Sequence, residues 1–439
     1  MSNSVTDDRV LSIIRSRIPD FYRRISPESL LLAYLRKNPP PEGYRCPDAI
    51  LSLGKAAGGL TAGLSTYFKI PPEQTLSILP VGYPPPQSSF PCVFGSHPVP
   101  DSTSFETLIR AKLFLGNLPD NGVLLVALSG GSSSILSDPV PNVTIGEKAL
   151  LTRRLIESGA PIEVINTLRI HLSTIKGGGL SALIAPRKCL YYVFSDIPGS
   201  DPTLVGSAPM TKMGRNGQEA LASLEFWLKD SIPDSVSSAL KSPVAYQPEL
   251  PLGYAPHFGG TIASSETLLS LSRKSFLTPE ISGKIRVHFL TDRLKGEARD
   301  AGAVISSLIL WQSRTTPGWS AWIASGETTV RLPSSLHGKG GRSLELGLSL
   351  ALELRKRKAI VLSLATDGWD GNSGLAGALI GAGALTSPQV YRGAMNALAS
   401  HDTGPFLRHH SMGIETGPSG SNLNDLVLVL LPPQKENAC

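Results

Sequence analysis

The sequence predicts an α/β protein with two domains and largely parallel sheets. Short apolar runs of strand length recur along the chain, and segments with the 3.6-residue period of amphipathic helices lie between most of them. The chain has 439 residues, which is more than one ordinary hydrophobic core supports. Hydrophobic residues make up 41% and charged residues 17% of the chain, a composition typical of a folded globular protein.

Each predicted strand is a short apolar run. Residues 123–128 are too few for a helix and too continuously apolar for a half-exposed strand, so a buried parallel strand is the better interpretation. Residues 145–157 predict a helix, with Thr144 as N-cap, Glu147 as its capping-box partner and Gly159 just beyond the end. The predicted strands span residues 49–53, 76–79, 123–128, 190–194, 285–290, 321–324, 359–364 and 426–431.

The boundary between the two domains is predicted in residues 231–260, which are rich in proline and show little periodicity. We therefore expect one domain in residues 1–245 and a second in residues 255–439. The proline-rich residues 81–100 lie inside the first series of strands, so we expect a packed loop over a site there rather than a linker.

Composition argues against several classes of function. The net charge of +6 is modest, and no basic stripe interleaves with aromatic residues, which argues against nucleic-acid binding. The four cysteines lack Cys-x-x-Cys spacing and indicate neither a zinc site nor a disulfide framework. Because no apolar run reaches the roughly 18 residues of a membrane span and no apolar segment follows the first residues, we expect a cytoplasmic protein without membrane contact.

The loop after residues 123–128 consists of glycine and serine and is a candidate anion-binding loop. Gly130 and Gly131 would let the backbone approach a ligand closely, while Ser129 and Ser132 add hydroxyl groups to the amides of a predicted helix start. An ordinary strand-to-helix turn is the alternative interpretation of the same residues.

Basic residues beside glycines form two further candidate anion sites. Lys55 follows a strand at a predicted helix start, where phosphate binds, although a surface lysine is an equally good interpretation. Arg169, His171 and Lys176 precede the triple glycine at residues 177–179, which would end their helix or bring backbone amides to a ligand. His171 alone is more often a structural histidine, but the cluster as a whole favours an anion.

Carboxylates follow other predicted strands. Asp196 comes directly after residues 190–194 and could bind Mg²⁺ or accept a proton from a substrate hydroxyl, although aspartate also caps turns. In the C-terminal half, Glu327 follows one strand, and Thr366 and Asp367 follow another. The same alternatives apply to these residues.

A glycine-rich loop with Lys339, Gly340 and Arg342 precedes a strongly apolar predicted helix. A guanidinium at a helix N-terminus is unfavourable unless an anion lies there too, which makes Arg342 a good candidate anion contact. A polar loop that includes Asn424 precedes the last strand. Together these strand ends predict a site for phosphorylated or carboxylated ligands between two α/β domains.

A series of sequence blocks along nearly the whole chain resembles the glycerate 2-kinases whose C-terminal part is called the MOFRL domain. The blocks occur in the family's order. They are GKAA (54–57), SHPVPD (96–101), ALSGGSSS (127–134), RIHLSTIKGGGLS (169–181), SDIPGSDP (195–202), GEAR (296–299), SGETTV (325–330), GKGGR (338–342), ATDGWDG (365–371) and TGPSGSNLNDL (416–426).

This resemblance implies a Rossmann-like N-terminal domain and a smaller α/β C-terminal domain. It also implies ATP- and Mg²⁺-dependent phosphorylation of D-glycerate to 2-phosphoglycerate, by a monomer or a homodimer. Lys55 and Arg342 would act in catalysis, with Asp196 as a base or, with Asp367, as a metal ligand. The implied substrate contacts are Ser129, Gly130, Gly131, Ser132, Arg169, His171 and Lys176, and the implied nucleotide contacts are Lys339, Gly340, Glu327, Thr366 and Asn424.

The sequence departs from the family's usual pattern at a few positions. Ser132 stands where a third glycine is common, and Ser343 and Leu344 stand where an Asn-Gln pair is common, which allows a different substrate or nucleotide preference. Two other functions stay open. One is a hydroxypyruvate reductase, which the lack of a Gly-x-Gly-x-x-Gly pattern after a strand disfavours. The other is a non-catalytic protein that binds phosphorylated metabolites.

Overall fold

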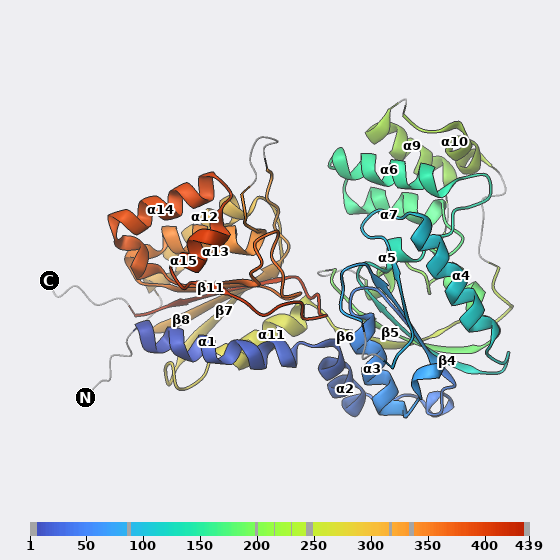
Figure 1. Cartoon of the computed structure of the whole chain (residues 1–439), viewed down its shortest axis with the longest axis horizontal. Helices are drawn as coiled ribbons and strands as arrows, with labels where there is room; N and C mark the ends of the chain where they lie inside the picture. The colour runs from blue at the N-terminus through green and yellow to red at the C-terminus, as the bar shows by residue number, and fades with distance from the viewer. Residues whose placement is uncertain are drawn as a thin grey trace. The chain divides into compact units, whose positions relative to one another are not determined.

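The computed structural model describes residues 7–85, 89–197, 201–214, 216–229, 231–242, 249–315, 318–332 and 338–433. The chain divides into two compact units, each with one six-stranded sheet (Figure 1). The N-terminal unit spans Pro27–Ile262, and the C-terminal unit joins the residues up to Ser26 to those from Ala263 onward. The α/β class with two domains is thus confirmed.

The sheet of the N-terminal unit has the strand order β3-β2-β1-β4-β5-β6. The pairs β1–β2, β1–β4 and β4–β5 are parallel, as their continuous apolar runs predict, and the pair β2–β3 is parallel as well. Strands β3 and β6 were not predicted, because their residues are only partly buried and lack a long apolar run. The strands are β1 (Ala49–Leu53), β2 (Thr75–Pro80), β3 (Cys92–Gly95), β4 (Val123–Ser129), β5 (Lys188–Phe194) and β6 (His257–Ala263).

The strand order reverses between β1 and β4. These two strands are paired, although β2 and β3 separate them in the chain. The connection from β1 leads outward to β2, and the connection from β4 leads outward to β5 on the other side. In open α/β sheets, ligands bind beyond the carboxyl ends of the strands at such a switch point. The loops that begin there are those of Gly54 and Gly130.

Helices cover both faces of this sheet. On one face α4, α5 and α8 share a buried apolar cluster with alternate residues of β1, β4 and β5, and α3 packs against the other face with α2 beside it. A separate apolar cluster joins α6, α7, α9 and α10, which group together in Figure 1. The helices are α2 (Pro27–Lys37), α3 (Ala57–Phe68), α4 (Ser102–Gly116), α5 (Ser132–Ile135), α6 (Ile145–Glu157), α7 (Ile162–His171), α8 (Gly179–Ile184), α9 (Gly217–Leu228) and α10 (Asp234–Lys241).

Helix α6 has the predicted capping. The Glu147 amide donates to the Thr144 hydroxyl over 3.1 Å, and the Thr144 amide donates to the Glu147 carboxylate over 2.7 Å. Of the two alternatives predicted for the triple glycine, the end of the preceding helix is wrong. Helix α7 ends at His171, and Gly178, with a φ of 95°, is the N-cap of α8. Arg169 and Lys176 therefore do not lie on one helix.

The sheet of the C-terminal unit has the order β11-β10-β9-β12-β8-β7. Here β7 and β8 are parallel, whereas the pairs β9–β10, β10–β11, β9–β12 and β8–β12 are antiparallel, so the prediction of largely parallel strands is wrong for this unit. Residues 366–376 join β9 to β10 without a helix, which antiparallel neighbours permit. The strands are β7 (Ile285–Leu294), β8 (Trp319–Gly326), β9 (Ile360–Ala365), β10 (Gly377–Gly381), β11 (Gly413–Ile414) and β12 (Asp425–Leu431).

Helix α1 (Asp7–Arg24) belongs to the C-terminal unit by its packing. Together with α11 (Ser265–Phe276) it covers one face of that unit's sheet (Figure 1). The Phe21 ring of α1 lies 4.9 Å from the Phe276 ring of α11. The predicted range 1–245 assigns this helix to the N-terminal domain, because its periodicity shows a buried face but not which sheet it covers.

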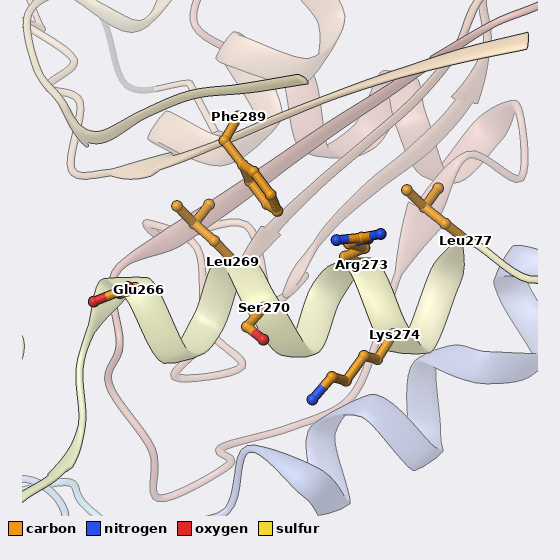
Figure 2. A pocket seen from close by; sticks show the side chains of 7 residues that line it. All are labelled: Glu266, Leu269, Ser270, Arg273, Lys274, Leu277 and Phe289. Atoms are coloured by element: carbon orange, nitrogen blue, oxygen red, sulfur yellow. The ribbon is translucent and has the colours of Figure 1, made fainter. Parts of the chain in front are cut away.

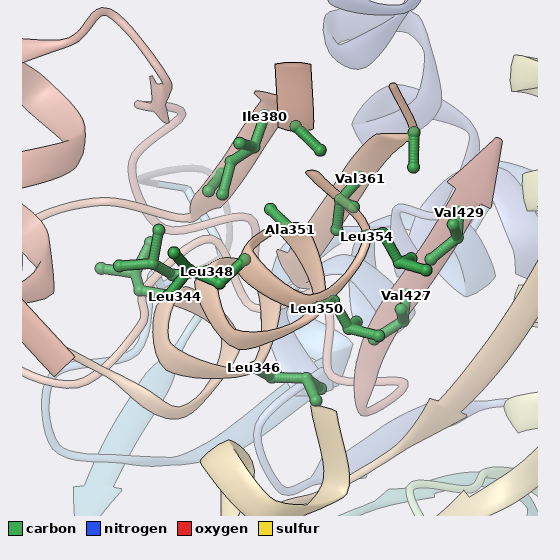
Figure 3. Close-up of a cluster of buried hydrophobic side chains, with 14 of the residues drawn as sticks. Leu344, Leu346, Leu348, Leu350, Ala351, Leu354, Val361, Ile380, Val427 and Val429 are labelled. Atoms are coloured by element: carbon green, nitrogen blue, oxygen red, sulfur yellow. The ribbon is translucent and has the colours of Figure 1, made fainter. Parts of the chain in front are cut away.

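Helix α13 (Arg342–Glu353) lies in the core on the opposite face, among α12 (Ala298–Gln312), α14 (Pro388–Ala399) and α15 (Thr403–His409). Its residues 343–352 are all buried. Figure 3 shows Leu344, Leu346, Leu348 and Leu350 in this cluster with Val361 and Val427 of the strands. The polar residues Ser343, Glu345 and Ser349 are buried together with these apolar side chains, so the segment is enclosed on all sides.

Candidate functional site

The loops after β1 and β4 are bonded to each other. The Lys55 amide donates to the Gly130 carbonyl over 2.8 Å, and the Ala56 amide donates to the Ser129 hydroxyl over 3.0 Å. Gly54 has a φ of 108°, and a Cβ there would lie 2.5 Å from the Ser129 carbonyl oxygen. Because a side chain does not fit at Gly54, glycine is required for this close approach, which fixes Lys55 against the glycine-serine loop.

Gly130 and Gly131 bring further side chains to the same place. A Cβ on Gly130 would overlap the Asp196 carboxylate, and its distance to Oδ1 would be 2.6 Å. A Cβ on Gly131 would lie 3.2 Å from the Lys55 Cγ and 3.6 Å from the His97 Cε1. Residues that follow β1, β3, β4 and β5 therefore meet at the switch point of this sheet. Lys55, Gly130, Gly131 and Asp196 were candidate residues from the sequence, whereas His97 was not, although it lies in the loop of residues 81–100 that was expected over a site.

Cations surround this point. Burial and then the charges of Lys55 and Arg169 lower the pKa of His97 to about 4, so its ring is neutral at pH 7. The His97 Nδ1 lies 2.8 Å from the Ser134 hydroxyl. Burial lowers the pKa of Arg169 to about 10, so its guanidinium stays charged. The arrangement suits an anionic ligand.

Lys176 adds a buried basic side chain to this group. Its side chain is enclosed, with 1% of the residue exposed, and its Nζ donates to the Ser132 carbonyl over 3.1 Å. Burial, and then the charges of Lys148 and Arg169, lower the pKa of Lys176 well below its usual value. Lys148 of α6 is also buried and was missed from the sequence. Its spacing from the buried Leu151 could have revealed it, because residues three apart share a helix face.

Ser132 is buried beside the same lysine. Its hydroxyl has no hydrogen-bond partner within the described part of the chain. It packs against Gly206, where a Cβ would overlap it. A buried hydroxyl without a partner costs free energy, and a ligand group placed there would remove that cost.

His171 lies in a different hollow from the Lys55 group. It comes two residues after Arg169 on α7, so the two side chains face different sides of the helix. Its Nδ1 lies 2.8 Å from the Thr167 carbonyl oxygen. The hollow, of about 450 Å³, is lined by Thr167, His171, Gly214, Asn216, Glu219, Ala220 and Ser223.

In the C-terminal unit, Arg342 is paired with carboxylates of the protein itself. Its Nε and Nη2 donate to Asp425 over 2.7 and 3.3 Å, and its Nη1 donates to Glu327 over 2.6 Å. Burial lowers the pKa of Arg342, but Asp425 and Glu327 outweigh it and raise that pKa above its usual value. The anion expected beside this helix start is therefore present within the fold.

Asp370 caps the same helix. Its two carboxylate oxygens accept hydrogen bonds from the Ser343 amide over 3.1 Å and from the Leu344 amide over 2.8 Å. Burial and the charge of Asp425 raise the pKa of Asp370 to about 7. Burial also raises the pKa of Asp425 to about 6, against the effect of Arg342. The Ser343 and Leu344 side chains are fully buried in the first turn, away from solvent.

Thr366 and Asn424 use their polar groups inside the fold. The Thr366 hydroxyl donates to the Asn424 carbonyl over 2.7 Å and accepts from the Leu423 amide over 2.8 Å. The Asn424 side-chain amide donates to the Ser265 hydroxyl over 3.1 Å. These bonds tie the end of β9 to the loop before β12.

The loop before α13 is fixed through its backbone. The Gly340 amide donates to the Asn372 side-chain oxygen over 3.0 Å, and the Lys339 amide donates to the Asp402 carboxylate over 2.8 Å. The Lys339 side chain is exposed. The remaining bonds of Asn372 also go to this loop, so the segment after β9 determines where Arg342 begins its helix.

Asp367 accepts a hydrogen bond from the Trp369 amide over 3.1 Å. Near it lies Tyr22 of α1, whose hydroxyl donates to the Ala365 carbonyl over 2.7 Å. Burial and then the charge of Asp367 raise the pKa of Tyr22. Sequence reasoning missed Tyr22, because nothing in the N-terminal helix shows which strand it reaches.

The two predicted metal ligands, Asp196 and Asp367, belong to different units. In the ranges that the structure describes, no group of three or more His, Cys, Asp or Glu side chains is arranged to hold a metal ion. No helix of those ranges is both long and apolar enough to cross a membrane.

A hollow of about 740 Å³ in the C-terminal unit lies between α11 and β7. Figure 2 shows Phe289 of β7 projecting toward Leu269 and Arg273 of α11. The residues that line this hollow are Glu266, Leu269, Ser270, Arg273, Lys274, Leu277 and Phe289. None of them was a candidate site residue from the sequence.

Comparison with known proteins shows similarity along both units. Residues 320–425 match the MOFRL family, and residues 23–241 match a domain of unknown function, DUF4147. A D-glycerate 2-kinase from Thermotoga maritima is 32% identical over 353 residues, which are 79% of this chain and 81% of the relative. A protein from Agrobacterium vitis provisionally named hydroxypyruvate reductase is 30% identical over 398 residues, which are 88% of this chain and 99% of the relative.

The same similarity is seen in three dimensions. The crystal structure of a glycerate kinase from Thermotoga maritima superposes with a TM-score of 0.77 at 26% sequence identity. The superposition covers 97% of this chain and all of the other.

Proposed function

Because the chain belongs to the MOFRL family of glycerate 2-kinases, which transfer a phosphoryl group to an alcohol, we propose that it phosphorylates D-glycerate at the 2-hydroxyl. ATP would be the donor, and the products would be 2-phosphoglycerate and ADP. The observation that carries the proposal is that three basic side chains, those of Lys55, Arg169 and Lys176, lie at the switch point of the N-terminal sheet. Both substrates and both products are anions, which these residues suit.

Phosphoryl transfer needs positioning and charge neutralisation more than covalent catalysis. Lys55 is held in place by the bond between its amide and Gly130, so its ammonium could neutralise the transferred group. Arg169 and Lys176 would bind the carboxylate of glycerate together with the Ser129 to Ser132 loop. His97, neutral at pH 7, could share the site without adding a charge.

Asp196 would either hold the metal or accept the proton of the 2-hydroxyl. It packs on Gly130, and the next residue, Gly131, lies against the Lys55 side chain. Mg²⁺ commonly binds one or two carboxylates and completes its shell with phosphates and water, so one carboxylate here fits a metal brought by ATP. When bound, Mg²⁺ supplies charge neutralisation to the phosphates.

The C-terminal unit would supply Arg342 as a second catalytic residue, Asp367 as a further metal ligand and Lys339, Gly340 and Glu327 as nucleotide contacts. Thr366 and Asn424 would act on the nucleotide only through the loops that their bonds shape. His171, in its separate hollow, would contribute to substrate binding only through α7.

The proposal is tested by ADP formation from ATP, Mg²⁺ and D-glycerate. Lys55→Met should lower kcat by about 100-fold or more, since removing one electrostatic contact to a transition state has that effect. Lys37→Met, at the exposed end of α2, should leave kcat unchanged and serves as the matched control. Absence of ADP formation with D-glycerate would refute the proposal.

A second candidate function is favoured by the name of the Agrobacterium relative. A hydroxypyruvate reductase would oxidise NADH or NADPH in the presence of hydroxypyruvate. We expect no such oxidation, and a steady loss of the reduced nucleotide would favour this alternative.

A further inference from the structure

Arg342 is held by carboxylates in two different ways. It makes a bidentate pair with Asp425, with distances of 2.7 and 3.3 Å, and the Asp425 side chain is 4% exposed. It makes a single bond of 2.6 Å to Glu327, whose side chain is 55% exposed. One guanidinium therefore has an enclosed partner and a solvent-facing partner.

The two partners differ in how readily a ligand could replace them. A bidentate pair in a buried site fixes the orientation of the guanidinium, and breaking it leaves an uncompensated buried charge. An exposed ion pair with a single bond contributes little net stability. An anionic ligand could therefore displace Glu327 from Arg342 but not Asp425.

The backbone of Glu327 would not have to move. Its amide donates to the Leu294 carbonyl over 2.8 Å. The preceding Gly326 has a φ of 156°, and a Cβ there would lie 2.6 Å from the Leu294 Cα, so the end of β8 is tightly packed on β7. The Glu327 carboxylate can leave Arg342 by rotation of its side chain alone.

We infer that Asp425 is a positioning residue for Arg342, and that Glu327 is an internal competitor that occupies the Nη1 side of the guanidinium until a ligand's anionic group replaces it. The inference rests on the proposed function for the identity of that group, which is a phosphate of ATP or the carboxylate of D-glycerate. Glu327 then lowers the affinity for that ligand, a role that replaces the nucleotide contact proposed for it above, and Asp425 makes the contact of Arg342 with the ligand possible.

The test is isothermal titration of the whole protein with Mg²⁺-ATP and, separately, with D-glycerate. Glu327→Gln should lower the Kd of one of the two ligands about two- to fivefold, which is the range expected from the loss of an exposed ion pair. Glu327→Asp keeps the charge but shortens the side chain, and it should tighten the same ligand. Glu280→Gln breaks an exposed pair with Arg17 of 2.8 Å and should change neither affinity.

Asp425→Asn tests the positioning role. It should weaken the same ligand and raise its KM more than it lowers kcat, and the gain from Glu327→Gln should vanish in the double variant. If Asp425→Asn does not fold, the titrations of Glu327→Gln and Glu327→Asp decide whether the inference holds. Unchanged or weaker binding by Glu327→Gln overturns the inference, and so does a gain that Glu327→Asp does not share, since that indicates long-range charge rather than displacement.

Failure of the inference and failure of the proposed function can be told apart. Binding is measured without turnover, so the expected pattern with no phosphorylated product would contradict the proposed function alone. Turnover of D-glycerate without any effect of the Glu327 variants would contradict the inference alone.

Discussion

Gly130→Ala is expected to damage activity far more than stability. The new Cβ would overlap the Asp196 carboxylate, and the distance to Oδ1 would be 2.6 Å. Since non-bonded contacts lie near 3.5 Å, and Oδ2 would lie even closer to the new Cβ than Oδ1 does, the carboxylate must retreat by well over about 1 Å. A misplacement of about 1 Å can cost roughly 100-fold in rate, so kcat/KM for D-glycerate should fall by about that factor. The displacement should reduce stability only a little, because it moves only the end of a side chain. Overpacking typically costs about 1–3 kcal/mol, and we expect a loss at the low end of this range.

Gly54→Ala is the matched comparison. Its Cβ would meet backbone, with the Ser129 carbonyl at 2.5 Å and the Gly130 carbonyl at 2.6 Å, and its φ of 108° disfavours any side chain. Urea unfolding should show a larger loss of stability for Gly54→Ala than for Gly130→Ala, by about 1–3 kcal/mol. Full activity of a folded Gly130→Ala protein would refute the idea that Asp196 acts from this position.

Buried ionisable groups give three further expected outcomes. Folding lowers the pKa of His97 from 6.5 to about 4. The contribution of the neutral His97 ring to the free energy of unfolding is therefore fully present above pH 6.5 and is lost as the pH falls toward 4. In urea unfolding, the stability lost between pH 6.5 and pH 4 should be smaller in His97→Gln by up to about 3 kcal/mol. An unchanged pH dependence of stability would contradict the lowered pKa of His97. Lys176→Met should keep or raise stability by about 1 kcal/mol while raising the KM for D-glycerate tenfold or more, because a buried polar amine is replaced by an apolar side chain. A large loss of stability would show that Lys176 supports the fold instead. Arg342→Met should cost about 3 kcal/mol at pH 8 by leaving Asp425 buried without its cation, and less at pH 5, where Asp425 can take up a proton. Thermal melts at both pH values check this, and equal losses would contradict the pairing.

The proximity of Lys55, Gly130 and Asp196 in the N-terminal unit could be predicted from the sequence. Gly130, Lys55 and Asp196 each follow an apolar run, and the carboxyl ends of parallel strands meet at one edge of a sheet. Their proximity could therefore be predicted without knowing any contact between residues that are far apart in the sequence. His97 could not be found in this way, because it follows β3, which is short and only partly buried.

The C-terminal site was harder to predict. Arg342 was expected to need an anion, but its partner Asp425 begins β12, which pairs with β8 and β9 in an antiparallel arrangement. Which strands become neighbours depends on packing across the whole unit and not on local periodicity. Tyr22 and the placement of α1 were missed for the same reason.

The position of the phosphate in the product tests the central claim most directly. The protein is incubated with ATP, Mg²⁺ and D-glycerate, and the product is identified by phosphorus and carbon NMR. A phosphate on the 2-hydroxyl, strongly reduced in Lys55→Met and unchanged in Lys37→Met, is the result expected here. A phosphate on the 3-hydroxyl, or no phosphorylated glycerate at all, would contradict it.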